Sequence, residues 1–167
     1  DDEWLTSNHR GYRQAHAKGN DLKGMIAEIL GKYTGTCKGK GGSMHIADLD
    51  AGNLGANGIV GGCMGIAVGA ALTQQMKKTG KIVVCFFGDG ATNEGVFHEA
   101  VNMASIWNLP GIFYGINNGY GISADIKKET NVKHIHERSA AYGIPGMFIP
   151  DGNNVIDVYE GFKKAVE

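Results

Sequence analysis

The chain has 167 residues, of which 43% are hydrophobic and 20% charged, and its formal net charge is -1. These values exclude a disordered chain, and the balanced charge gives no electrostatic basis for a nucleic-acid partner. Glycine is enriched, with 27 residues, more than twice the usual share of about 7%. Prolines are few and no Gly-X-Y period appears, so the glycines are expected in turns and at close backbone approaches.

The cysteines indicate the cellular compartment of the protein, and the two ends of the chain indicate whether it belongs to a longer polypeptide. Cys37, Cys63 and Cys85 share no metal-ligand spacing, and they favour a reducing, cytoplasmic setting. No basic-then-apolar leader is present, and the apolar run 58–72 is too short and too rich in glycine for a membrane span. The first residue is not Met and the last ones continue a helical pattern, so residues 1–167 are expected to be one domain of a longer polypeptide.

The first half of the chain predicts helices separated by glycine-rich loops. Apolar residues at positions 22, 25, 26, 29 and 30 predict a helix over 21–32, with Asn20 or Asp21 as its N-cap. The other elements expected there are a loop at 34–42, a glycine-punctuated turn at 52–58 and a helix over 59–78.

The second half predicts an α/β arrangement. Residues 82–87 form a continuous apolar run rich in β-branched and aromatic residues, which is typical of a strand buried on both faces of a parallel sheet. The elements expected after it are a helix over 93–107, a strand over 112–116, a mobile polar stretch over 121–138, a short strand over 147–149 and a helix over 154–167. This order predicts an α/β fold with an open, mostly parallel sheet and helices on both faces.

Two polar residues follow predicted strands and carry the chemistry of the chain. Asp89 and Asn118 lie 29 residues apart, each just after a strand, and open α/β sheets bind ligands beyond such strand ends. Glycines flank Asp89 and a helix begins soon after it, so backbone N–H groups can approach a phosphate. Carboxylate and amide oxygens suit Mg²⁺ bound with a diphosphate. On spacing alone, two unrelated turns remain the alternative.

Several motifs resemble one enzyme family. Gly88-Asp89-Gly90 followed by Asn117-Asn118 resembles the thiamine-diphosphate fingerprint. The run GDGATNEGVFHEAVNMASIWNLPGIFYGINNGYGIS, with KGKGGSMHIADLD, GANGIVGGCMG and SNHRGYRQAHAKG, is similar to the alpha subunit of the first, decarboxylating component of 2-oxo-acid dehydrogenase complexes. Within this family the chain looks most like the acetoin dehydrogenase type, with the pyruvate dehydrogenase type close behind. The resemblance implies a thiamine-diphosphate-binding fold.

The resemblance implies a set of ligand-binding residues. Mg²⁺ would be held by side-chain oxygens of Asp89 and Asn118 and by the carbonyl of Tyr120. The whole cofactor-binding set would be His9, Arg10, Gly58, Val60, Gly88, Asp89, Gly90, Ala91, Asn118 and Tyr120. Within it, Arg10 would pair with the diphosphate and Gly58 would meet the aminopyrimidine. His9 stands where relatives often carry Tyr.

The resemblance also implies an activity and partners. The protein would be a thiamine-diphosphate- and Mg²⁺-dependent oxidoreductase that cleaves acetoin or decarboxylates pyruvate and passes the two-carbon unit to a lipoyl acceptor. It would work only with a beta subunit, as an alpha2-beta2 assembly, beside a lipoyl-bearing acyltransferase. No catalytic residue is expected in this segment, because the family's catalytic carboxylate lies in the beta subunit. The alternatives are a transketolase-like enzyme and a non-catalytic diphosphate-binding module.

Two sets of glycines fall outside the predicted site. Gly61, Gly65 and Gly69 repeat every four residues on a predicted helix, and we interpret them as a close-approach surface for another subunit. Gly111 and Gly115 fall in or beside the second predicted strand, where glycine weakens packing, and the sequence offers no reason for them.

Some polar residues near these motifs have an ordinary explanation. His45 and His98 are interpreted as hydrogen-bonded structural histidines rather than substrate contacts. Lys38 and Lys40 are expected on a solvated loop.

Overall fold

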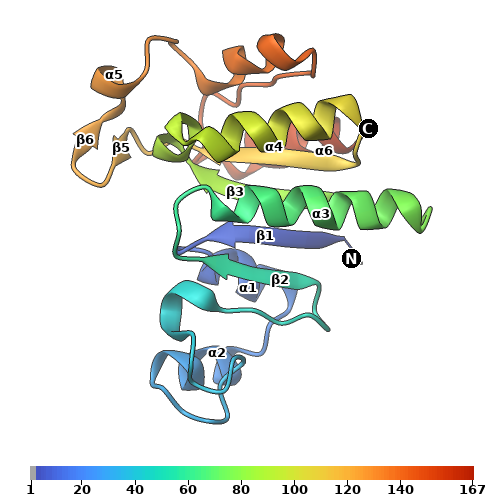
Figure 1. The fold of residues 1–167 in the computed structure, drawn as a ribbon. Coiled ribbons are helices and arrows are strands. Elements are labelled where there is room, and N and C mark those ends of the chain that lie inside the picture. The colour runs from blue at the N-terminus through green and yellow to red at the C-terminus, as the bar shows by residue number, and fades with distance from the viewer. Residues whose placement is uncertain (1–2) are drawn as a thin grey trace.

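The fold is built on one parallel sheet. A computed structural model describes residues 3–167. The sheet has four strands in the order β2-β1-β3-β4, which are β1 (Trp4–Asn8), β2 (Asn53–Asn57), β3 (Val83–Gly88) and β4 (Gly111–Ile116). Every neighbouring pair is parallel, so the four carboxyl ends lie along one edge (Figure 1). The predicted open parallel sheet is confirmed.

Helices cover both faces of the sheet, as expected. One face carries α3 (Gly62–Met76) and α4 (Gly95–Ile106), while α1 (Tyr12–Lys18) and α6 (Val155–Val166) lie behind the sheet in Figure 1. The main core joins the first face to the strands through buried residues that include Met64, Ala67, Cys85, Phe87 and Phe97. The rings of Tyr114 and Phe162 lie 6.0 Å apart and join β4 to α6. Among residues 3–167, none of the helices is both long enough and apolar enough to cross a bilayer.

The remaining elements lie beyond the two outer strands. Near β2 are α2 (Leu22–Ile29) and the 3-10 helix η1 (Gly42–His45), at the bottom of Figure 1. At the carboxyl end of the strands are the 3-10 helix η2 (Asp89–Asn93), the hairpin β5 (Tyr120–Gly121) with β6 (Ala124–Asp125), and α5 (Ile126–Glu129). The 3-10 helix η3 (Ile135–Tyr142) follows and packs near α4.

Three parts of the fold differ from expectation. The predicted turn at 52–58 contains strand β2, and the sequence analysis predicted neither β1 nor α1. The predicted strand at 147–149 is wrong, because that segment pairs with no strand. Instead it packs on α6, where a Cβ on Gly161 would lie 2.7 Å from Ile149 Cδ1.

Only two of the three glycines predicted to share one face of a helix lie within α3. Gly61 precedes the helix with φ of 78°, and a Cβ there would lie 2.7 Å from Val96 Cγ1. It therefore shapes the turn into α3 rather than its outer face. Gly65 and Gly69 are exposed, and a Cβ on either would meet no atom within 4 Å.

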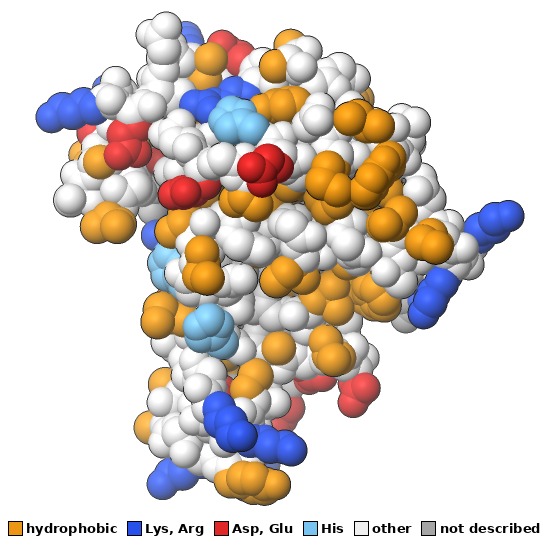
Figure 2. Space-filling view, viewed as in Figure 1, with side chains coloured by type: hydrophobic (Ala, Val, Ile, Leu, Met, Phe, Trp, Pro, Cys, Tyr) orange, Lys and Arg blue, Asp and Glu red, His pale blue; other side chains and the backbone are white. Residues whose placement is uncertain are grey.

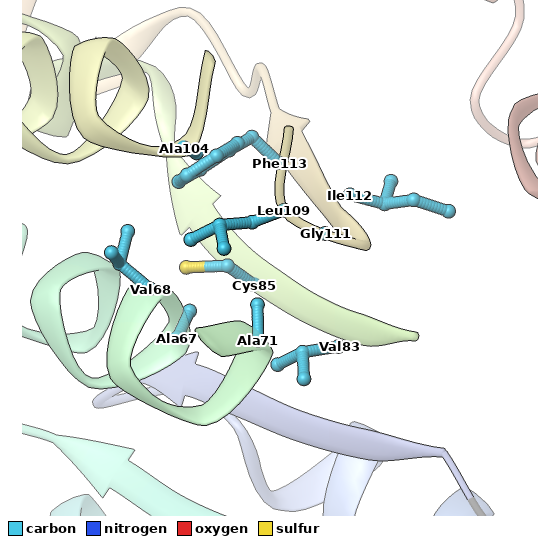
Figure 3. A pocket seen from close by; sticks show the side chains of 10 residues that line it. All are labelled: Ala67, Val68, Ala71, Val83, Cys85, Ala104, Leu109, Gly111, Ile112 and Phe113. Carbon is cyan, nitrogen blue, oxygen red and sulfur yellow. The ribbon is translucent and has the colours of Figure 1, made fainter. Parts of the chain in front are cut away.

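The two glycines of β4 occupy different environments. Gly111 borders a small apolar cavity of about 10 Å³ between β4 and α3 (Figure 3). A Cβ on Gly111 would lie 3.8 Å from Ala71 Cβ, an ordinary contact. A Cβ on Gly115 would lie 3.2 Å from two ring carbons of Phe87. Gly115 therefore makes room for an aromatic ring, whereas nothing in the packing requires glycine at Gly111.

Candidate functional site

The strand order places a topological switch point between the ends of β1 and β3. From β1 the chain continues to β2 on one side, and from β3 it continues to β4 on the other. The loops after β1 and β3 therefore diverge, and open α/β sheets bind their ligands at such a point. Arg10 follows β1, and its Nη2 atom lies 3.3 Å from where a Cβ on Gly88 would be. The structure thus brings Arg10 to the loop that carries Asp89, and His9 precedes Arg10 in the segment that follows β1.

Asp89 is a buried carboxylate without a partner. It opens η2 and is 1% exposed. Neither of its side-chain oxygens has a hydrogen-bond partner among residues 3–167, whereas its backbone carbonyl accepts a 2.7 Å hydrogen bond from the Thr92 hydroxyl. A buried carboxylate without donors is costly unless a cation neutralises it. The side chain therefore fits the predicted Mg²⁺ ligand, although the described residues contain no cluster of three His, Cys, Asp or Glu that would hold a metal.

The loop after β4 folds back toward Asp89. Asn117 Oδ1 accepts a 2.9 Å hydrogen bond from the Gly119 N–H, and Asn118 Oδ1 accepts a 3.1 Å bond from the Tyr120 N–H. These turns bring β5 against η2, where a Cβ on Gly90 would lie 3.1 Å from the Cα of Gly121. Glycine at position 90 thus permits a close approach of the two loops. Asn118 and Tyr120 remain exposed at the strand edge.

Arg138 ties the stretch after β5 to the Asp89 loop. Its guanidinium donates to the Thr92 carbonyl at 2.7 Å, to Asn93 Oδ1 at 2.9 Å and to Thr130 Oγ1 at 2.7 Å. The Asn93 side chain also donates to the Glu129 carbonyl at 3.3 Å. The sequence analysis missed this residue, because an arginine in a polar stretch resembles an ordinary surface residue.

His45 lies on the Gly58 side of the strand edge. Gly58 follows β2, and a Cβ there would lie 3.1 Å from His45 Nε2. Val60, two residues on, is 42% exposed. The imidazole makes no hydrogen bond within residues 3–167, so the interpretation of His45 as a hydrogen-bonded structural residue is wrong. His98 does fit that interpretation, because its Nδ1 atom is hydrogen-bonded to the Tyr142 hydroxyl.

The glycine-rich loop 37–42 surrounds a second buried carboxylate. Glu28, on α2, is 0% exposed. Its Oε2 accepts from the N–H groups of Cys37 at 2.8 Å and Gly39 at 2.7 Å, and its Oε1 accepts from Gly41 at 2.7 Å and Gly42 at 3.0 Å. Burial opposes ionisation, but the four donors outweigh it and hold the pKa of the Glu28 carboxyl below its ordinary value of 4.5.

This arrangement explains a motif that resembles a phosphate-binding loop. Successive N–H groups in such a loop form a concave site for an anion. Here the anion is the carboxylate of Glu28, and the N–H groups of Cys37, Gly39, Gly41 and Gly42 face inward. The sequence analysis missed Glu28, although the glycines at 39, 41 and 42 are the signal that something approaches this backbone closely. Glycine at position 35 belongs to the same packing, since a Cβ there would lie 2.4 Å from Glu28 Oε2.

Comparison with known proteins identifies one family over the whole chain. Residues 1–167 match the family described as "Dehydrogenase E1 component". The alpha subunit of acetoin:2,6-dichlorophenolindophenol oxidoreductase from Bacillus subtilis is 53% identical over 167 residues, which is 100% of this chain and 50% of the relative. The same subunit from Cupriavidus necator is 46% identical over 166 residues, 99% of this chain and 50% of the relative.

A pyruvate dehydrogenase subunit also matches. The E1 component subunit alpha from Rickettsia felis is 36% identical over 166 residues, 99% of this chain and 50% of the relative. The chain thus spans about half the length of the curated relatives it matches.

Proposed function

The chain belongs to the dehydrogenase E1 component family, and on that premise we propose that it binds thiamine diphosphate and Mg²⁺ as part of an alpha subunit. The observation that carries the proposal is Asp89, a carboxylate that is 1% exposed and has no donor among residues 3–167. It lies at the divergence of β1 and β3, and Arg10 lies near the preceding residue, Gly88. A divalent cation held by Asp89 would offset the buried negative charge and favour an anionic ligand such as a diphosphate.

The proposed ligands divide between two sides of the strand edge. Asp89, Asn118 and the Tyr120 carbonyl would hold Mg²⁺. The backbone of Gly88, Gly90 and Ala91 would contact the diphosphate, with Arg10 and His9 on the segment that follows β1. The family resemblance places Gly58 and Val60 at the aminopyrimidine; Gly58 follows β2, and the Val60 side chain is exposed.

These residues bind and orient the cofactor. When bound, thiamine diphosphate would supply a nucleophilic carbon and an electron sink. The Arg10 guanidinium suits two diphosphate oxygens at once. The exposed Val60 side chain offers an apolar surface to the middle of the cofactor. The chain supplies binding and orientation, and the catalytic carboxylate is expected from a beta subunit.

We propose acetoin as the substrate in preference to pyruvate. The two relatives named for acetoin are 53% and 46% identical to the chain, against 36% for the pyruvate dehydrogenase subunit. The proposed acceptor is a lipoyl group on an acyltransferase partner. The cytoplasmic location remains a prediction.

The beta subunit is proposed to cover the outer face of α3 in an alpha2-beta2 assembly. Gly65 and Gly69 leave a shallow surface there, and Ile66 between them is 46% exposed. Figure 2 shows hydrophobic side chains exposed over the face that carries α3 and α4. A Cβ at position 65 would meet no atom within 4 Å among residues 3–167, so Gly65→Leu should weaken assembly and leave the fold unchanged. Light scattering on the co-expressed subunits measures this.

Calorimetry on the full-length protein separates the candidate functions. Mg²⁺-dependent binding of thiamine diphosphate, without binding of ATP or NAD, is the expected result. Binding of ATP or NAD instead would support the non-catalytic diphosphate-binding module. Assaying the assembled enzyme with acetoin, pyruvate and a ketose phosphate then distinguishes the proposed substrate from pyruvate and from the transketolase-like alternative.

A further inference from the structure

Glu28 and His45 are joined by a short and tightly bonded segment. The carboxylate of Glu28 binds the N–H groups of Gly41 and Gly42, and η1 begins at Gly42 and ends at His45. A Cβ on Gly41 would lie 2.9 Å from the Cβ of His45, so the loop and the histidine are in direct contact. The Cys37 thiol also donates to the His45 carbonyl at 3.2 Å.

The segment is fixed on its other side by the sheet. Ile46 is 0% exposed, and its carbonyl accepts a 2.9 Å hydrogen bond from the N–H of Ala56, in β2. His45 therefore lies between loop 37–42, which is hydrogen-bonded to Glu28, and Ile46, which is hydrogen-bonded to β2. Its imidazole lies against Gly58, at the end of the same strand.

We propose that Glu28 is a positioning residue whose carboxylate fixes loop 37–42 and thereby places the imidazole of His45 at the Gly58 side of the cofactor site. The inference rests on the proposed function, because it takes the Gly58 side to receive the aminopyrimidine. Glu28 itself does not touch the cofactor and acts only through the loop and His45.

The negative charge is what the loop requires. Each carboxylate oxygen accepts two N–H groups. In Glu28→Gln one oxygen becomes an NH₂ group, which cannot accept hydrogen bonds and faces two donors. Two amides of the loop then lack an acceptor, while the size of the side chain is unchanged. The loop is expected to rearrange and to carry His45 away from Gly58.

The test compares two ligands on the full-length protein co-expressed with its partner subunit. Calorimetry with Mg²⁺ measures the affinity for thiamine diphosphate, which reaches both sides of the site, and for inorganic pyrophosphate, which reaches only the Asp89 side. Glu28→Gln should weaken thiamine diphosphate at least about tenfold, or about 1.4 kcal/mol, and leave pyrophosphate within about twofold. Glu160→Gln, on the exposed surface of α6, is the matched control and should change neither.

A double-mutant cycle tests whether the effect passes through His45. His45→Ala should reproduce the selective loss, and adding Glu28→Gln should cost little more, because coupled residues are not additive. Equal losses for both ligands in Glu28→Gln, no loss, or additive losses in the double variant would overturn the proposal. If wild-type protein binds neither ligand, the proposed function fails and this inference with it.

A second variant keeps the test decisive if Glu28→Gln does not fold. Gly41→Ala retains the carboxylate and adds a methyl group 2.9 Å from His45 Cβ and 3.5 Å from Glu28 Oε1. Its φ of -91° is ordinary for alanine. It should give the same selective loss of thiamine diphosphate, and unchanged affinity for both ligands would contradict the proposal.

Discussion

Glu28 and Asp89 are both buried carboxylates, yet the chain treats them in opposite ways. Glu28 is 0% exposed and accepts four backbone hydrogen bonds, whereas Asp89 is 1% exposed and accepts none from residues 3–167. Burial alone therefore does not mark a functional acid. The charge of Glu28 is satisfied by its own loop, and that of Asp89 is the one we propose to be neutralised by Mg²⁺.

The difference follows from the two loops. Around Glu28, Lys38 and Gly39 adopt positive φ of 58° and 73°, and this conformation lets successive amides converge on one point. Around Asp89, the short η2 turn directs no N–H group to the side chain. The amides of the first loop consequently bind a carboxylate of this chain, whereas the carboxylate of Asp89 accepts no hydrogen bond from residues 3–167.

The largest effect is expected from Asp89→Asn. The change removes the charge at nearly constant size, so Mg²⁺-dependent affinity for thiamine diphosphate should fall by about 100-fold or more. Without ligands the variant should melt at a higher temperature than wild type, because an unpartnered buried carboxylate is lost. Calorimetry and thermal melting in the presence of a chelator measure the two effects. Unchanged cofactor affinity at saturating Mg²⁺ would contradict the assignment.

Glu28→Gln should change stability in the opposite direction. The pKa of Glu28 is lowered in the folded protein, so its carboxylate stabilises the fold above the unfolded pKa and this contribution disappears as pH falls through the folded pKa. The variant should melt below wild type at neutral pH, and the difference should shrink as the pH falls below the ordinary carboxyl pKa of 4.5. Melting curves at neutral and acidic pH measure it. A constant difference at all pH values would exclude the ionised carboxylate as its source.

Arg138→Ala should have an intermediate effect on the Asp89 side. It removes the donors that join η2 to Thr130, so hydrogen exchange over 121–138 should accelerate and cofactor affinity should fall about tenfold. Arg138→Lys should rescue little, because an ammonium does not reproduce the planar fork. The exposed Lys133→Ala is the control. Slow exchange in Arg138→Ala, equal to wild type, would show that the contacts of the guanidinium do not hold this stretch.

The smallest effect belongs to Gly111→Ala, at the end of β4 opposite to the site. The methyl group reaches an ordinary 3.8 Å contact with Ala71 beside the cavity of about 10 Å³. We expect a gain of about 0.4–1 kcal/mol, since alanine restricts the unfolded chain, with cofactor affinity unchanged. Gly115→Ala should instead destabilise, because its methyl group crowds Phe87. Denaturant unfolding measures the free energy of unfolding of both variants. A lower value for Gly111→Ala than for wild type would show that the structure has no room for the added methyl group.

The sequence by itself determined the elements with a strong local pattern. The apolar run before Gly88 predicts strand β3, and helical periodicity predicts α2, α3, α4 and α6. An aspartate flanked by two glycines directly after a strand indicates a ligand site. These features depend on residues close together in the chain, such as the Asp21 side chain that caps α2 by accepting from the N–H groups of Lys23 and Gly24. β1 and β2 are short and polar, and only pairing with neighbouring strands makes them strands.

Only the tertiary structure decided which polar groups are satisfied. Glu28 and loop 37–42 meet across 9 to 14 residues of sequence, and Arg138 reaches Thr92 across 46. No local pattern specifies such partners, because a carboxylate or guanidinium is equally compatible with solvent until the fold removes the water. The same holds for the glycines at 65 and 111, whose open surroundings depend on which elements pack beside them. Folding thus separated an acid that stabilises a loop from an acid that remains open to a ligand.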